Sequence, residues 1–120
     1  MLRVPLAGRL ILVVEDEPLI ALDVENALRI AGARVVAAGY VESGLCTAEH
    51  PDLSAAVVDL RLGNGDGAVV CRRLRQLRVP FVVYTGYTAS DIAREWPDVP
   101  ILQKPATASQ IVVSLVSLMV

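Results

Sequence analysis

The stretch Ala55-Ala56-Val57-Val58-Asp59-Leu60-Arg61-Leu62 changes character at a single aspartate. An apolar, partly β-branched run leads up to Asp59, and the turn-forming series Gly63-Asn64-Gly65-Asp66-Gly67, which we expect to be a flexible loop, follows soon after it. A short apolar run bounded by turn residues is typical of a buried β-strand. We therefore expect Asp59 at the carboxyl end of such a strand, which is the sheet edge where open α/β folds bind ligands. A lone aspartate could equally leave the strand and cap the next turn.

Strand and helix patterns alternate along the rest of the chain. The other strands are predicted at 10–14, 34–41, 81–84 and 101–103. The helices are predicted from Pro18 to Gly32, over 42–49, around 70–77, over 89–96 and from a Thr107–Gln110 capping box onward. This alternation predicts an α/β fold, a parallel sheet with helices on both faces. We expect a doubly wound, flavodoxin-like sheet of order 2-1-3-4-5, with a short fourth helix because prolines close it.

The composition bounds the kinds of protein that the chain can be. Its 120 residues fit one domain, and 54% hydrophobic but 4% aromatic residues predict an aliphatic core. The net charge of −2 offers no basic footprint for direct nucleic-acid binding. Cys46 and Cys71 form no disulfide or zinc motif, and there is no signal peptide or apolar run of membrane-spanning length. We therefore expect one cytoplasmic domain over residues 1–120.

Acidic residues follow the first strand as well as the third. Glu15 and Asp16 come directly after the apolar run 10–14, and the predicted strand order places them beside Asp59. Any one of these acids could belong to a solvated helix start, where the helix dipole favours negative charge. Three carboxylates that lie close together repel one another and invite a cation, and oxygen ligands without His or Cys favour Mg²⁺.

Two more strand ends add groups that suit phosphoryl chemistry. The fourth strand ends at Thr85, which Gly86 follows, and the fifth ends at Lys104, the only lysine of the chain. An aspartate nucleophile, a cation, an ammonium group and a hydroxyl that converge on one point make a phosphoryl-transfer site. In that site Asp59 accepts the phosphoryl group, while Mg²⁺ and Lys104 neutralise the phosphoryl oxygens and Thr85 donates a hydrogen bond.

Four motifs at strand ends together resemble those of the receiver domain of two-component response regulators. They are V-V-E-D-E-P at 13–18, V-V-D-L-R-L at 57–62, Y-T-G at 84–86 and Q-K-P at 103–105. The resemblance covers nearly the whole chain. It implies a phosphoprotein of a phosphorelay that is phosphorylated by a sensor histidine kinase or phosphotransfer protein, and that catalyses only its own phosphorylation and dephosphorylation.

The resemblance also implies a role for each site residue. Asp59 would be the phosphoacceptor and, with Asp16, a direct Mg²⁺ ligand. The backbone carbonyl of Arg61 would be a third direct ligand, and Glu15 would act through water. The phosphoryl group would contact Thr85 and Lys104.

The chain departs from the usual receiver pattern in its second half. Ile101 stands where many receivers carry an aromatic switch residue, and only 104 − 85 = 19 positions separate Thr85 from Lys104. The pattern from Phe81 to Tyr87 is similar to the receiver subgroup with an F-A-T-G-Y motif, with Tyr84 in place of the alanine. We expect the switch to reorder residues 86–99, with Tyr87 reporting the change and Gly86 giving the backbone freedom.

Two other function classes stay open from the residues alone. A Mg²⁺-dependent phosphatase with an aspartyl nucleophile usually needs a second acid two residues after the nucleophile, where this chain has Arg61. A phosphorylation-independent interaction module would not need the Asp, Thr and Lys set. The kinase and the output partner cannot be named from the sequence, and neither can the context of the chain, alone or within a larger protein.

Surface expectations concern the last helix and the third. The last ten residues are rich in apolar side chains, so Ile111, Leu115 and Leu118 are expected in the core, with some of Val112, Val116 and Val120 exposed. That surplus suggests a homodimer through the last helix. The third helix carries four arginines that are expected to form a solvated face, at 72, 73, 75 and 78.

Overall fold

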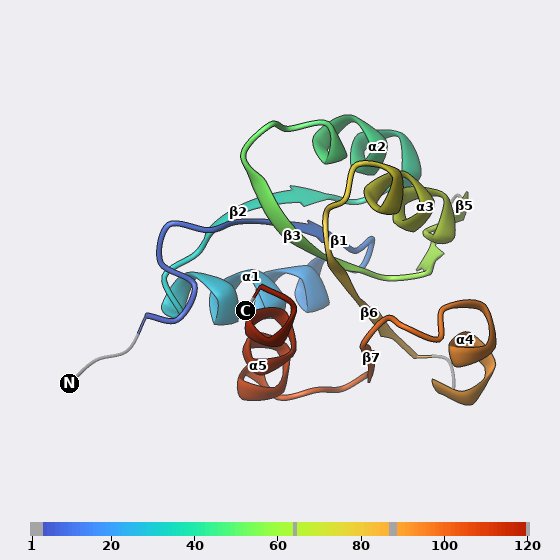
Figure 1. Ribbon diagram of the computed structural model, residues 1–120. Helices are drawn as coiled ribbons and strands as arrows, with labels where there is room; N and C mark the ends of the chain where they lie inside the picture. The colour runs from blue at the N-terminus through green and yellow to red at the C-terminus, as the bar shows by residue number, and fades with distance from the viewer. Residues whose placement is uncertain (1–3, 64, 87–88, 120) are drawn as a thin grey trace.

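The protein forms one parallel five-stranded sheet, in the order β2-β1-β3-β6-β7. The computed structural model describes residues 4–63, 65–86 and 89–119, without the side chains of 89–91 (Figure 1). The strands of this sheet are β1 (Leu10–Val14), β2 (Arg34–Ala38), β3 (Leu53–Val58), β6 (Phe81–Thr85) and β7 (Ile101–Gln103). The predicted doubly wound, flavodoxin-like order is confirmed, because these strands are the five expected ones in chain order.

Helices cover both faces of the sheet. The helices are α1 (Pro18–Ile30), α2 (Val41–Ala48), α3 (Ala68–Gln76), α4 (Ala89–Glu95) and α5 (Ala108–Leu118). Figure 1 shows α1 and α5 on one face and α2 and α3 on the other. Each face has its own aliphatic core, and buried Ile92 of α4 joins the core under α2 and α3.

Local sequence signals set the helix ends. Pro18 occupies the first turn of α1, and Gly32 follows the helix with a φ of +99°, a conformation that favours glycine. The predicted capping box of α5 is present. The Thr107 hydroxyl accepts a hydrogen bond from the Gln110 backbone N–H, and the Gln110 side-chain oxygen accepts one from the Thr107 backbone N–H.

The register of the sheet brings the strand ends together. Val14 of β1 pairs with Val58 of β3, and Val58 pairs with Val83 of β6. Both pairings are parallel, so Glu15 and Asp59, which come next along the chain, leave the sheet side by side.

The segment after Asp59 differs from the flexible loop that its glycines predict. It contains a short antiparallel hairpin of β4 (Arg61–Leu62) and β5 (Gly65–Asp66). Gly67 closes this hairpin by donating its N–H to the Leu60 carbonyl at 2.8 Å. A Cβ on Gly67 would lie 2.0 Å from the Asp59 carbonyl oxygen, so the backbone approach requires glycine.

Three further expectations need correction. The second strand ends at Ala38, because the chain turns at Tyr40 and Val41 already begins α2. On α5, Ile111 and Leu115 are buried as predicted and Leu118 is half-buried, but the exposed valine is Val113. Val112 and Val116 are half-buried against the core because α5 packs beside α1 on the same face of the sheet, and Val120 lies outside the described residues.

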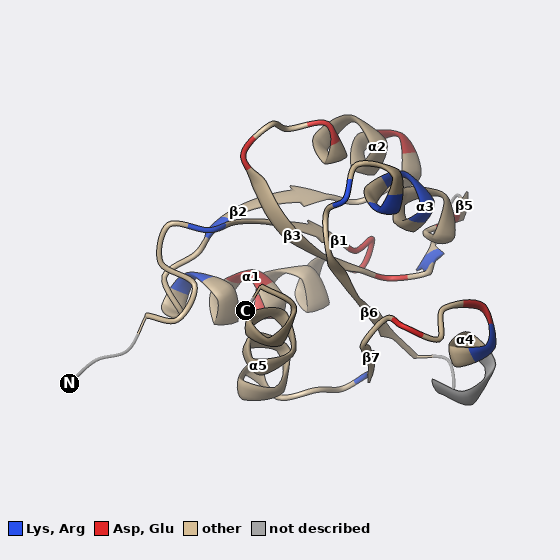
Figure 2. Ribbon diagram, viewed as in Figure 1, with Lys and Arg blue, Asp and Glu red and all other residues tan. Residues whose placement is uncertain are grey.

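The arginines of α3 are not simply a solvated face. Arg73 forms an ion pair with Glu49 at 2.6 Å, and Arg75 forms one with Asp98 at 3.0 Å. Arg72 lies 3.9 Å from a carboxylate oxygen of Glu95. These partners lie on neighbouring elements, far away in the sequence, so helical spacing alone could not reveal them. Figure 2 shows basic α3 between acidic segments.

Within the described part of the chain, no helix is both long and apolar enough to cross a membrane.

Candidate functional site

Backbone hydrogen bonds fix the residues that follow β1 and β3. The Asp59 N–H donates to the Val14 carbonyl at 2.9 Å, and the Glu15 N–H donates to the Ala38 carbonyl at 2.9 Å. The sheet ladder therefore continues past the last strand residues and holds both residues at the same edge. Local turns then satisfy the carboxylates: Asp59 Oδ1 accepts from the Arg61 N–H at 3.0 Å, and Glu15 Oε2 accepts from the Glu17 N–H at 3.2 Å.

Polar burial in the described residues is concentrated at this edge. The buried polar or charged side chains found there are Glu15, Asp59 and Thr85, which are 6%, 5% and 0% exposed. Asp16 stays exposed, yet one ligand oxygen of each of Glu15, Asp16 and Asp59 lies within 4.8 Å of the others. Burying charge is unfavourable unless it is paired, so this cluster requires positive charge beside it.

Lys104 supplies that positive charge from the end of β7. Its Nζ lies 2.5 Å from Glu15 Oε1 and 2.9 Å from Asp59 Oδ2. The Lys104 backbone N–H donates to the Thr85 carbonyl at 2.7 Å, which fixes the residue beside β6. The ammonium also lies 5.6 Å from the centre of the Tyr84 ring.

Protonation equilibria reflect this partly buried arrangement. Burial raises the pKa of Glu15 above its ordinary value, and the hydrogen bond from Lys104 offsets only part of that rise. For Lys104, burial acts to lower the pKa, but hydrogen bonds to Glu15 and Asp59 outweigh it, so the pKa is raised. Lys104 therefore stays charged at neutral pH.

The residues surround an open cleft of about 540 Å³. The predicted residues that line it are Glu15, Asp16, Asp59, Arg61, Thr85, Gly86 and Lys104. Two predicted switch positions stand apart: Ile101 packs half-buried in the core on the α4 side, and Tyr87 lies outside the described residues.

Gly63 has a role that the sequence did not reveal. A Cβ on Gly63 would lie 3.1 Å from Asp16 Oδ2, so glycine leaves space next to that carboxylate oxygen. Its place in a glycine-rich series pointed to loop flexibility, and only the folded hairpin brings it over Asp16.

The donor set fits a hard divalent cation. The clustered groups offer carboxylate oxygens only, and neither cysteine nor histidine lines the cleft among the described residues. Mg²⁺ prefers such oxygen ligands, few in number, with water completing its shell. Exposed Asp16 adds a carboxylate whose charge no ion pair to a described residue neutralises.

Comparison with known proteins identifies the family to which this chain belongs. A family model of the response regulator receiver domain matches residues 11–115. The chain belongs to this family. Receiver domains are signalling modules of two-component systems, and the family match confirms the resemblance seen in the motifs. Membership of the F-A-T-G-Y subgroup stays a prediction.

Individual relatives agree with this assignment. The sensor protein TorS of Escherichia coli is 34% identical over 87 residues, which are 72% of this chain but 9% of that protein. A response regulator receiver protein from Sinorhizobium medicae is 29% identical, with a TM-score of 0.86 over 93% of this chain and 94% of that one. The receiver domain of a sensor histidine kinase from Pseudomonas aeruginosa is 28% identical, with a TM-score of 0.78 over 91% and 95% of the chains. That structure holds a magnesium ion in its active site cleft.

Proposed function

We propose that this receiver domain accepts a phosphoryl group on Asp59 from a sensor histidine kinase or phosphotransfer protein, in a Mg²⁺-dependent reaction. The observation that carries the proposal is the position of the Asp59 carboxylate. It is buried between the Lys104 ammonium and the Arg61 backbone N–H, and it opens onto the cleft beside Asp16.

The reaction requires a nucleophile and a way to hold negative charge. A carboxylate oxygen of Asp59 attacks the phosphorus of a phosphohistidine, the P–N bond breaks, and the imidazole leaves with the bonding electrons. Lys104 then pairs with the phosphoryl oxygens, and the Thr85 hydroxyl donates to one of them. Attack of water on the acyl phosphate later releases phosphate and restores the carboxylate.

A metal ion would be held by this chain's own oxygens. We propose Asp16, Asp59 and the Arg61 carbonyl as direct ligands, with Glu15 acting through water. When bound, Mg²⁺ neutralises charge on the phosphoryl oxygens. The magnesium in the Pseudomonas receiver supports this assignment, as do the clustered carboxylates.

The rival functions fit the site less well. The phosphatase alternative needs an acid two residues after the nucleophile, and Arg61 is exposed at that position and lines the cleft. An interaction module without phosphorylation would have no use for a buried carboxylate pair held by the chain's only lysine. We therefore propose that the domain catalyses only its own phosphorylation and dephosphorylation.

Several finer predictions stay open. They are one receiver domain over 1–120, a cytoplasmic location, an unidentified output partner and a homodimer through α5. The 86–104 surface is also predicted to switch through a reordering of residues 86–99 that involves Gly86 and Tyr87 instead of Ile101. The chain spans only a small part of TorS, so that protein's wider activity is not carried over.

Intact mass spectrometry tests the proposed function. The chain is incubated with acetyl phosphate and Mg²⁺, and we expect the mass of one phosphoryl group to be added. Asp59→Asn should show no addition, while the control Asp52→Asn, at an exposed position before β3, should react like the natural chain. Normal labelling of Asp59→Asn would refute the assignment.

A further inference from the structure

The carboxyl end of α4 is packed more firmly than its short length suggests. Trp96, the only tryptophan, follows α4 and is 4% exposed. Its ring meets Phe81 of β6 edge to face, with 5.7 Å between ring centres and 81° between planes. Its indole N–H has no hydrogen-bond partner among the described residues, so packing and ring contacts hold the side chain in place.

Arg75 of α3 lies over the ring of this tryptophan. The guanidinium carbon lies 4.8 Å from the centre of the Trp96 ring, a cation–π distance. The same guanidinium pairs with Asp98 at 3.0 Å. Arg75 thus joins α3 to two residues of the turn that follows α4. We call Phe81, Arg75, Trp96 and Asp98 the α3–α4 clamp.

Backbone hydrogen bonds reinforce the clamp. The Trp96 N–H donates to the Ile92 carbonyl at 2.9 Å, and the Val99 N–H donates to the Trp96 carbonyl at 3.3 Å. The Pro100 carbonyl accepts from the Val83 N–H at 3.0 Å, which ties the end of this turn to β6. The turn from 96 to 100 is therefore fixed to the sheet and to α3.

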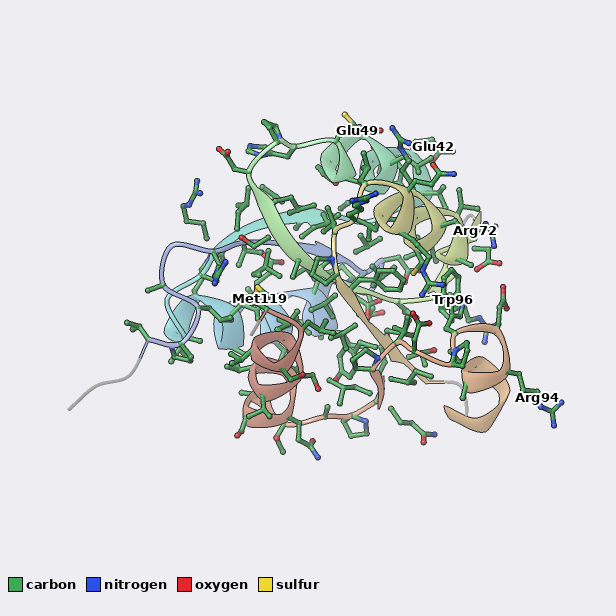
Figure 3. All side chains as sticks on the ribbon, viewed as in Figure 1. Glu42, Glu49, Arg72, Arg94, Trp96 and Met119 are labelled. Carbon is green, nitrogen blue, oxygen red and sulfur yellow. The ribbon has the colours of Figure 1, made fainter. Side chains whose placement is uncertain are left out.

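Gly86, the last described residue before α4, is not packed in this way. Gly86 is exposed, and a Cβ placed on it would meet no atom of the described residues beyond its chain neighbours within 4 Å. Arg94, on α4 itself, points away from the rest of the molecule, whereas Trp96 lies between α3 and α4 (Figure 3). A helix of seven residues has little stability of its own, so its fixed end decides how it can move.

We propose that the α3–α4 clamp is a pivot: phosphorylation of Asp59 turns α4 about Trp96 without releasing Trp96 from Arg75 and Phe81. This inference rests on the proposed function, because the phosphoryl group supplies the signal. It narrows the switch predicted over 86–99, since residues from 96 onward stay docked. The α3 surface and the end of α4 then form one continuous face in both states.

Fluorescence and hydrogen exchange together test the pivot. The single tryptophan reports the clamp, and beryllofluoride with Mg²⁺ serves as the phosphoryl mimic on the full chain. We expect amide exchange in α4 to change on addition of the mimic, while the Trp96 emission maximum and its quenching by acrylamide stay the same. An increase in Trp96 quenching with the mimic would overturn the pivot, as would unchanged exchange in α4 when exchange around Asp59 responds.

Substitutions test the clamp without any phosphoryl mimic. Arg75→Gln and Asp98→Asn should each raise acrylamide quenching of Trp96, several-fold for Arg75→Gln, because the ring loses its cover. Arg73→Gln, which removes the ion pair to Glu49, and Arg94→Gln are matched controls and should change nothing. Unchanged quenching in Arg75→Gln would overturn the clamp. If Asp59 accepts no phosphoryl group, the proposed function fails, whereas these variants still decide whether the clamp exists.

Discussion

The carboxyl edge of the sheet and the interior of the same strands use burial in opposite ways. Every residue of β1 is buried and apolar, and so are the last four of β3. One residue further along each strand, Glu15 and Asp59 are buried as carboxylates. Burial of aliphatic surface stabilises the fold, whereas burial of a carboxylate opposes folding unless a cation is close.

The difference shows where stability and function separate. The interior needs only volume and hydrophobicity, while the edge keeps charges that a stable fold does not require. Functional sites commonly break the rules that the rest of a fold obeys. Substitutions in the interior should therefore change unfolding, and substitutions at the edge should change the response to Mg²⁺ and to phosphodonor.

The largest expected loss of stability comes from the interior. Leu28 of α1 is fully buried, so Leu28→Ala should lower the free energy of unfolding by about 2–5 kcal/mol. Leu19, on the same helix, is 76% exposed, and the control Leu19→Ala should stay within about 0.5 kcal/mol. Urea unfolding measures both. Equal losses would contradict the division between core and surface.

At the edge, removal of Lys104 should destabilise the metal-free protein and sharpen its response to Mg²⁺. Lys104→Met leaves Glu15 and Asp59 buried without a cation, which we expect to lower the free energy of unfolding by about 1–3 kcal/mol. Added Mg²⁺ should then raise the melting temperature more than it does in the natural chain, because the ammonium no longer competes with the metal for the carboxylates. Exposed Arg94→Met is the control. A smaller Mg²⁺ response in Lys104→Met would count against competition between the ammonium and the metal.

Asp16 should contribute mainly through the metal. We expect Mg²⁺ to raise the melting temperature of the natural chain by a few degrees through mass action, and Asp16→Asn to remove most of that rise. Asp23→Asn, at an exposed carboxylate of α1, should keep the full rise. A full rise in Asp16→Asn would show that this carboxylate does not bind the ion.

The smallest expected effect concerns the two thiols. Burial raises the pKa of Cys71 to about 12 from an ordinary 9.0, whereas Cys46 is exposed. Because the folded-state pKa is raised, the contribution to stability is complete below pH 9.0 and is lost as the pH rises toward 12. In mildly alkaline solution a thiol reagent should label Cys46 and spare Cys71, as peptide mass spectrometry can show. Equal labelling would mean that the interior opens readily.

The sequence allowed the fold and the main site residues to be predicted because their signals are local. Apolar runs that end in Glu15, Asp59, Thr85 and Lys104 mark both the strands and the edge where they meet. Two elements were not predicted because their local signals are weak or misleading. The hairpin over 61–66 has strands too short to show a period, and Val41 extends an apolar run although it begins a helix.

Contacts between distant segments were the other limit. The Arg75–Asp98 and Arg73–Glu49 pairs span 23 and 24 positions, so the arginines of α3 looked like an ordinary solvated face. The sequence placed Trp96 at the end of a predicted helix and indicated nothing about its contacts. Its burial against Phe81 depends on the path of the chain between α4 and β7. Such pairings follow from topology and cannot be predicted from spacing along one helix.

Location of the phosphoryl adduct tests the central claim most directly. After incubation with acetyl phosphate and Mg²⁺, hydroxylamine converts an aspartyl phosphate to a hydroxamate, which peptide mass spectrometry assigns to one residue. We predict a hydroxamate at Asp59 that forms only when Mg²⁺ is present. A hydroxamate at another carboxylate, or one at Asp59 that forms equally well without Mg²⁺, would contradict it.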